Sequence, residues 1–182
     1  MRSQHDRSAQ QTLELGRRLS ADRHLQAEID KGIASLAAGL PSPVGLRLAR
    51  VLVAVLEPSW SEHVGFQDVV LFPIIAKATD TPSEVRNLLE GLGREHDEIG
   101  ARHVEVTAIL NTFIAGRHKS TELTAPLAQT FSLRRRHHDA EAALEDAIPA
   151  ALDADDSAAF KRWTASRADS PFPMNLILDI WD

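Results

Sequence analysis

The sequence predicts an all-α fold, an antiparallel up-down four-helix bundle followed by a short fifth helix and an apolar C-terminal tail. Apolar residues recur at intervals of three and four along almost the whole chain, and alternation at two is nowhere sustained. Proline and glycine divide this pattern into four long segments with short turns between them, which typically pack antiparallel. The 182 residues, 43% of them hydrophobic, suit one domain with a buried core.

The first predicted helix spans about 12–39 and ends at Gly39 and Pro41. Residues 1–12 are polar, and we expect them to be a flexible N-terminus. One stripe of large apolar side chains follows the helix at helical spacing, which predicts a single buried face. The stripe consists of Leu25, Ile29, Ile33, Leu36 and Leu40.

The second predicted helix begins at Ser42-Pro43, an N-cap followed by proline in the first turn, and continues to about residue 78. Pro58 lacks a backbone donor, so we expect it to break or kink the helix, which then resumes near Trp60. For the same reason Pro73 predicts a bend in the last turns.

The third predicted helix opens with Thr81-Pro82-Ser83-Glu84, a capping box with proline at the first helical position, and lasts to about residue 116. The fourth runs over about 122–147, and a shorter fifth over 155–167 after Asp153. The bundle is therefore expected to comprise residues 13–152. The short helix and the tail make up residues 153–182.

Composition restricts the chemistry that this chain can carry out. Its 20 Lys and Arg against 26 Asp and Glu give a net charge of −6, which argues against nucleic-acid and anionic-membrane partners. With eight His but no Cys and no Tyr, any metal or redox site must use imidazole and carboxylate. Because no signal peptide or membrane span stands out, we expect a cytoplasmic protein.

Histidines on three predicted helices fall on the apolar side, counting about 100° per residue. A single inward histidine is usually a hydrogen-bonded core residue, whereas several facing one interior are satisfied together by a shared metal ion. On the fourth helix His138 lies on the stripe and His137 at its edge. The inward polar residues are His63 and Gln67, then Glu95, His96 and His103, then Arg134, His137, His138, Glu141 and Glu145.

Three short motifs follow one another along the chain. They are His63 with Gln67 four residues later and then Leu71-Phe72-Pro73, Glu95-His96, and His137-His138 with the nearby Glu141. Their order and spacing resemble the hemerythrin family, specifically its bacterial HHE cation-binding branch, over roughly residues 20–150. Two positions depart from that family: Asp22 stands where it has a first-helix histidine, and Gln67 where it has a bridging carboxylate.

The resemblance implies one or two non-haem iron ions, with zinc or manganese as alternatives, and a diatomic ligand such as dioxygen or nitric oxide. Because of the two departures, an intact di-iron site, a single or altered site and a metal-free bundle all stay open. His103 lies two turns beyond His96, where it could serve an altered second position. The candidate metal ligands are His63, His96, His103, His137, His138, Glu141, Asp22 and Gln67.

The leading hypothesis is a hemerythrin-like protein that holds iron, or that binds, senses or scavenges dioxygen or nitric oxide. We favour a binder over an enzyme, because no nucleophile motif or Gly-rich phosphate loop is present. The alternative is a metal-poor or metal-free interaction module that uses the apolar tail, residues 170–182. We expect this tail to cover a groove of its own bundle. The alternative is that the tail forms a homodimer contact.

Overall fold

The computed structural model describes residues 4–39, 42–77, 82–144, 147–149 and 152–167, and every regular element within these ranges is a helix. The all-α class is therefore confirmed. The α-helices are α1 (Gln4–Ala37), α2 (Ser42–Phe66), α3 (Phe72–Lys77), α4 (Ser83–Ile114), α5 (Thr124–Ala142) and α6 (Ala154–Ala165). A π-helix, η1 (Gln67–Leu71), joins α2 to α3, and a 3-10 turn, η2 (Ser120–Glu122), precedes α5.

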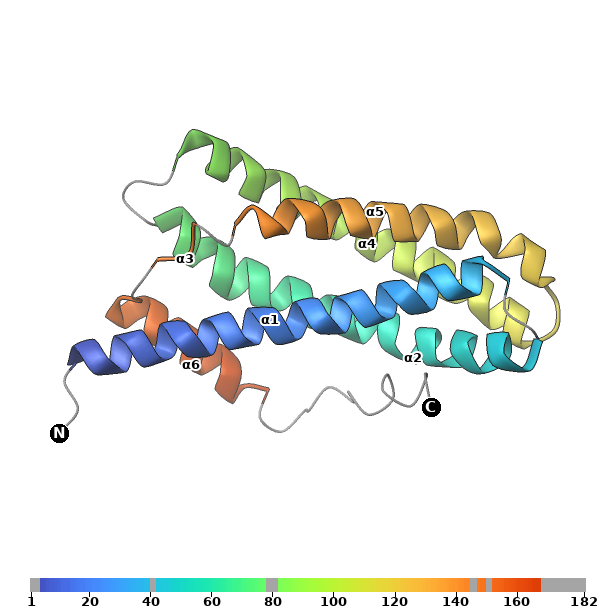
Figure 1. Ribbon diagram of the computed structural model, residues 1–182, viewed down its shortest axis with the longest axis horizontal. Coiled ribbons are helices and arrows are strands. Elements are labelled where there is room, and N and C mark those ends of the chain that lie inside the picture. The colour runs from blue at the N-terminus through green and yellow to red at the C-terminus, as the bar shows by residue number, and fades with distance from the viewer. Residues whose placement is uncertain (1–3, 40–41, 78–81, 145–146, 150–151, 168–182) are drawn as a thin grey trace.

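The four long helices α1, α2, α4 and α5 lie alongside one another, and the chain direction alternates from each to the next (Figure 1). Helix α1 contacts α2 and α5, and α4 contacts the same two helices, so the four surround a shared interior. Helix α6 crosses near the start of α1 and packs against α1 and η1. Turns after α1 and α4 contain Gly39 and Gly116, whose φ of 81° and 71° favours glycine.

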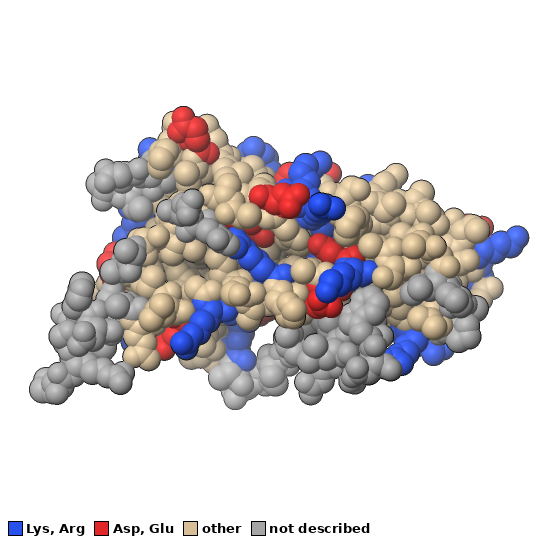
Figure 2. Space-filling model, viewed as in Figure 1, with Lys and Arg blue, Asp and Glu red and all other residues tan. Residues whose placement is uncertain are grey.

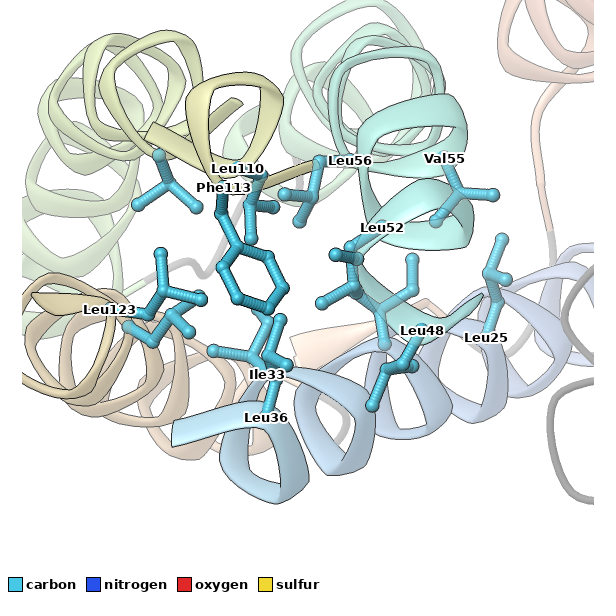
Figure 3. Close-up of a cluster of buried hydrophobic side chains, with 14 residues drawn as sticks. Leu25, Ile33, Leu36, Leu48, Leu52, Val55, Leu56, Leu110, Phe113 and Leu123 are labelled. Atoms are coloured by element: carbon cyan, nitrogen blue, oxygen red, sulfur yellow. The ribbon is translucent and has the colours of Figure 1, made fainter. Parts of the chain in front are cut away.

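Two large apolar clusters fill the interior, one toward each end of the long helices, and a small third cluster contains Trp60, Ile99 and Leu133. Figure 3 shows the first, in which side chains from α1, α2 and α4 point toward one another and meet Leu123. The second gathers residues from the other halves of these helices and from α3 and α6, among them Leu15, Phe66, Ile75, Leu92 and Trp163. Buried polar residues, including Asp22, His63, His96 and His137, lie along each helix between the two clusters. The interior is therefore apolar at both ends and polar in its middle.

Two helix boundaries differ from the sequence-based expectation. Helix α1 begins at Gln4 rather than near residue 12, because its first half packs against α6 and buries Leu15. Helix α5 ends at Ala142 rather than near 147, and the chain continues in turns where Leu144 donates to the Glu141 carbonyl. The capping-box residue Thr81 and the apolar tail lie outside the described residues.

Of the break or kink predicted at Pro58, the break is wrong. Helix α2 continues through Pro58, which is exposed, as is Ala54, whose carbonyl would otherwise accept the missing hydrogen bond. A carbonyl on the exposed face can hydrogen-bond to water, so the proline is tolerated. The irregularity lies instead just before Pro73, where the Phe72 N–H donates to the carbonyl of Gln67, five residues back.

Acidic and basic side chains are interspersed on the face shown in Figure 2, and neither sign forms a continuous patch there. Exposed ion pairs of this kind include Lys77 with Asp153 and Arg102 with Glu105. Among the described residues, no helix combines the length and the apolar character needed to cross a membrane.

Candidate metal centre

Four buried side chains from three helices converge in the polar middle of the interior. His63 comes from α2, His96 from α4, and His137 and Glu141 from one face of α5, at i and i+4. Each offers a nitrogen or oxygen atom, and these atoms all lie within 4.8 Å of one another. None of the four side chains is more than 3% exposed. This buried group could hold a metal ion.

Glu141 Oε1 is the point on which the cluster converges. It lies 3.0 Å from His63 Nε2 and 3.1 Å from His137 Nε2, within ion-pairing distance but without the angles of a hydrogen bond. Two ligands held at about 2.1 Å from one ion and at right angles are roughly 3 Å apart, so this spacing suits neighbouring ligands of one metal.

A carboxylate holds the outer nitrogen of each clustered histidine. An Nδ1–H donated to a carboxylate fixes the tautomer in which Nε2 carries the lone pair, and it turns that lone pair inward. Histidines that ligate metals almost always donate their other ring N–H to a carboxylate, a backbone carbonyl or a water molecule. The pairs are His63 Nδ1 with Asp22 Oδ2 at 2.7 Å, His96 Nδ1 with Asp68 Oδ1 at 3.0 Å, and His137 Nδ1 with Glu95 Oε2 at 3.1 Å.

The π-helix η1 lets two consecutive residues contact one histidine. Asp68 reaches His96 Nδ1, while Gln67 Oε1 lies 2.9 Å from His96 Nε2 and the Gln67 amide nitrogen donates to Glu141. A neutral imidazole has a single proton, so it cannot donate to both oxygens at once. A cation in place of the second proton would satisfy the Nε2 lone pair.

The charges within the cluster are unequal. Burial works to lower the pKa of His63, but the Glu141 and Asp22 carboxylates outweigh it and raise the pKa to about 9. Burial likewise works to raise the pKa of Glu141, but His63 and His137 hold it well below its usual range. At His96, burial and the neighbouring His137 and His63 lower the pKa to about 3. The metal-free cluster is thus a His63–Glu141 ion pair beside a neutral His96.

A second buried polar group surrounds Arg134, which is fully buried on α5. Its guanidinium donates to Asp30, to Gln26 Oε1 at 2.8 Å and to His103 Nε2 at 3.1 Å. Burial and the Arg134 charge lower the pKa of His103 to about 3, so His103 accepts this hydrogen bond as a neutral imidazole. His138 Nδ1 lies 3.1 Å from Asp30 and joins this group, which can be called the Arg134 network.

Trp60 contacts both polar groups. Its ring stacks on His63 with centroids 4.8 Å apart and meets His137 edge-on at 5.4 Å. It also meets His103 edge-on at 5.3 Å, and the Arg134 guanidinium carbon lies 5.4 Å from its centroid. Its indole N–H donates to the backbone carbonyl of His96 at 3.1 Å, which fixes the ring in place. Trp60 therefore packs between the four-residue cluster and the Arg134 network.

The structure distributes the eight candidate ligands among three places. Asp22 contacts the outer nitrogen of His63, and Gln67 lies between His96 and Glu141. His103 and His138 belong to the Arg134 network. The inward histidine of α5 at the cluster is thus His137, which the helical wheel placed at the edge of the stripe. The remaining candidates, His63, His96, His137 and Glu141, form the cluster.

Sequence reasoning missed Asp30 and Gln26 and treated Trp60 only as an apolar residue. A signal was present, because Asp22, Gln26 and Asp30 recur at every fourth position of α1 beside its apolar stripe. All three are at least 91% buried. A polar row at this spacing on a buried face indicates a polar layer inside a helical fold.

Comparison of the chain with models of protein families, with curated proteins and with solved structures finds no match.

Proposed function

We propose that this chain is a hemerythrin-like, non-haem iron-binding protein whose four long helices form an up-down bundle. The observation that carries the proposal is the orientation of the three clustered histidines. Each has its Nδ1 at a carboxylate, and the three histidines and Glu141 each offer a ligand atom that lies within 4.8 Å of the others. The Nε2 atoms of His63 and His137 are buried without a hydrogen-bond partner, and a single cation bound beside Glu141 would satisfy both.

The donor set supports a single ion rather than two. Asp22 is engaged with the outer nitrogen of His63, and Gln67 is a neutral amide where a second ion would need a bridging carboxylate. His63, His96, His137 and Glu141 would hold the ion. Bound iron would supply a redox-active centre with coordination positions open to a diatomic molecule such as dioxygen or nitric oxide. Zinc and manganese are the competing metals for these ligands.

The surrounding residues would keep bulk water away from the ion. Trp60 and Phe72 stack on His63 and His96, with centroid distances of 4.8 and 5.5 Å, and both aromatic residues are buried. A dry site strengthens the attraction between an ion and Glu141, because the local dielectric constant is low.

Metal content tests the proposal directly. The protein is purified without chelators, reconstituted anaerobically with ferrous iron, desalted and assayed for bound metal, in parallel with zinc and manganese. We expect the wild-type chain to retain iron and His96→Ala to lose it. His118→Ala is the matched control, because His118 is exposed and pairs with Glu122 in the η2 turn before α5. A wild-type chain that retains no metal, or a His96→Ala variant that retains as much, would refute an iron site at this cluster.

A further inference from the structure

A groove of about 560 Å³ opens between α2 and α4 beside the candidate metal centre. Trp60 and His96 line it, together with small residues such as Gly100. A Cβ atom on Gly100 would lie 3.7 Å from the Trp60 ring, so the ring packs directly against the α4 backbone. Val104, which also lines the groove, is 60% exposed. The α2–α4 groove is thus a mostly apolar surface next to a buried polar site.

The described chain ends at this groove. Arg167, its last described residue, donates from Nε to Glu62 Oε2 at 2.6 Å. Its Nη2 atom lies 3.2 Å from the position that a Cβ atom on Gly65 would occupy, and Gly65 lines the groove. The Arg167 guanidinium also lies over the Trp163 ring, 4.3 Å from the centroid. These three contacts hold Arg167 beside the groove.

We propose that the C-terminal segment, residues 170–182, occupies the α2–α4 groove of its own molecule. The groove follows α2 from Glu57 to Gly65, which is about 12 Å of helix. The fifteen residues after Arg167 can span up to roughly 50 Å, so the segment reaches the whole groove. Its composition suits an apolar surface, with Phe172, Met174, Leu176, Ile177, Leu178, Ile180 and Trp181 among its residues.

Because the chain contains no cysteine, a single introduced thiol is the only one that reacts in a thiol-protection experiment. Ala101→Cys places a single thiol in the groove, and Ser132→Cys places one on the exposed side of α5, away from it. The rate of reaction with an aromatic disulfide reagent is measured in the full chain and in a chain that ends at Asp169. We expect the Ala101→Cys thiol to react about tenfold faster after truncation, and the Ser132→Cys thiol to react equally in both.

A second pair of variants covers the case in which the truncated chain does not fold. In the full chain, Ile177→Asp puts a charge on an apolar residue of the segment and is expected to expose the Ala101→Cys thiol, whereas Asn175→Asp leaves it protected. Equal reactivity with and without the segment would overturn the proposal. Protection that is lost on dilution would also overturn it, because the segment would then come from a second copy. These reaction rates measure whether the segment covers the groove, and they do not depend on bound metal.

Discussion

The three clustered histidines differ in how deeply their carboxylate partners are buried. Asp22, the partner of His63, is 1% exposed, whereas the side chain of Asp68, the partner of His96, is 43% exposed. A buried carboxylate acts through a low dielectric and an exposed one is screened by water and salt. Asp22, together with Glu141, outweighs burial and raises the pKa of His63 to about 9, whereas burial and the neighbouring His137 and His63 lower the pKa of His96 to about 3.

The buried partner is expected to matter more for metal binding. Asp22→Asn keeps the shape of the side chain but removes the charge that orients His63, so we expect metal affinity to fall by about 10- to 100-fold. Asp68→Asn is the matched comparison and is expected to have a smaller effect, because water screens its carboxylate. Competition with a chelator measures both affinities. An equal loss in the two variants would contradict the role assigned to burial.

A negative charge at position 67 should lower the stability of the metal-free protein and increase the stabilisation that a bound metal provides. Gln67→Glu replaces the amide that donates to Glu141 with a second carboxylate, so the metal-free chain should lose about 1–3 kcal/mol of stability. A bound cation neutralises both carboxylates, and the rise in melting temperature on adding metal should exceed that of the wild type. Gln129→Glu, at an exposed position of α5, is the control. An unchanged metal-induced shift in Gln67→Glu would show that Gln67 does not face the ion.

Among the elements, η1 has the closest link to the site. A proline at position 73 cannot donate a hydrogen bond, and its ring would clash with the carbonyl four residues back in a regular α-helix. The wider π-turn avoids this clash and brings Gln67 and Asp68 to opposite nitrogens of His96. The sequence signal for this geometry is therefore Pro73 rather than the residues that touch the histidine.

The two prolines of this region offer a matched pair of substitutions. Pro73→Ala restores a donor and should favour a regular α-helix, which would rotate Gln67 and Asp68 relative to His96 and weaken metal binding. Pro58→Ala, on the exposed face of α2, should raise the unfolding free energy by up to about 3 kcal/mol and leave metal affinity unchanged. Chelator competition and denaturant unfolding measure the two effects. A Pro73→Ala variant that binds metal as tightly as the wild type would exclude a role for η1.

At the scale of the whole molecule, two arginines and a glutamate connect the end of helix α6 to α1 and α2. Glu62 on α2 accepts from Arg18 of α1 at 2.9 Å and from Arg167 at 2.6 Å, and both guanidinium groups pack on the Trp163 ring. These contacts join α1, α2 and α6. Because the four-residue cluster is buried in this core, folding is coupled to proton binding there, and the binding of a metal ion would be coupled to both.

This coupling predicts how pH acts on the protein. In the folded metal-free chain His63 keeps its proton up to about pH 9, above its ordinary pKa of 6.5. Its contribution to stability is therefore complete below pH 6.5 and is lost as pH rises toward 9. Because a metal must displace this proton, metal affinity should rise about tenfold per pH unit between pH 7 and 9 and then level off. Chelator-buffered titrations measure the slope, and an affinity independent of pH would contradict a protonated His63.

Much of the fold follows from periodicity, because helical spacing and proline–glycine punctuation are local properties of the chain. The helical spacing predicted that His63, Gln67, His96 and His103 face the interior, and all four are buried. Helical spacing alone did not identify whether His137 or His138 faces the cluster. Adjacent residues differ by about 100°, and the packing of the neighbouring helices determines which of them points inward. The role of Asp22 was missed for the same reason, because it depends on a contact with a residue 41 positions away.

The position of Trp60 also gives the molecule an optical property. An indole stacked on His63 at 4.8 Å is within a few ångströms of the candidate ion, a distance at which open-shell transition metals quench tryptophan emission efficiently. Zinc has a filled d shell and would leave that emission largely intact. The chain thus contains its own fluorophore at the site, and the intensity of its emission would distinguish iron from zinc without any label.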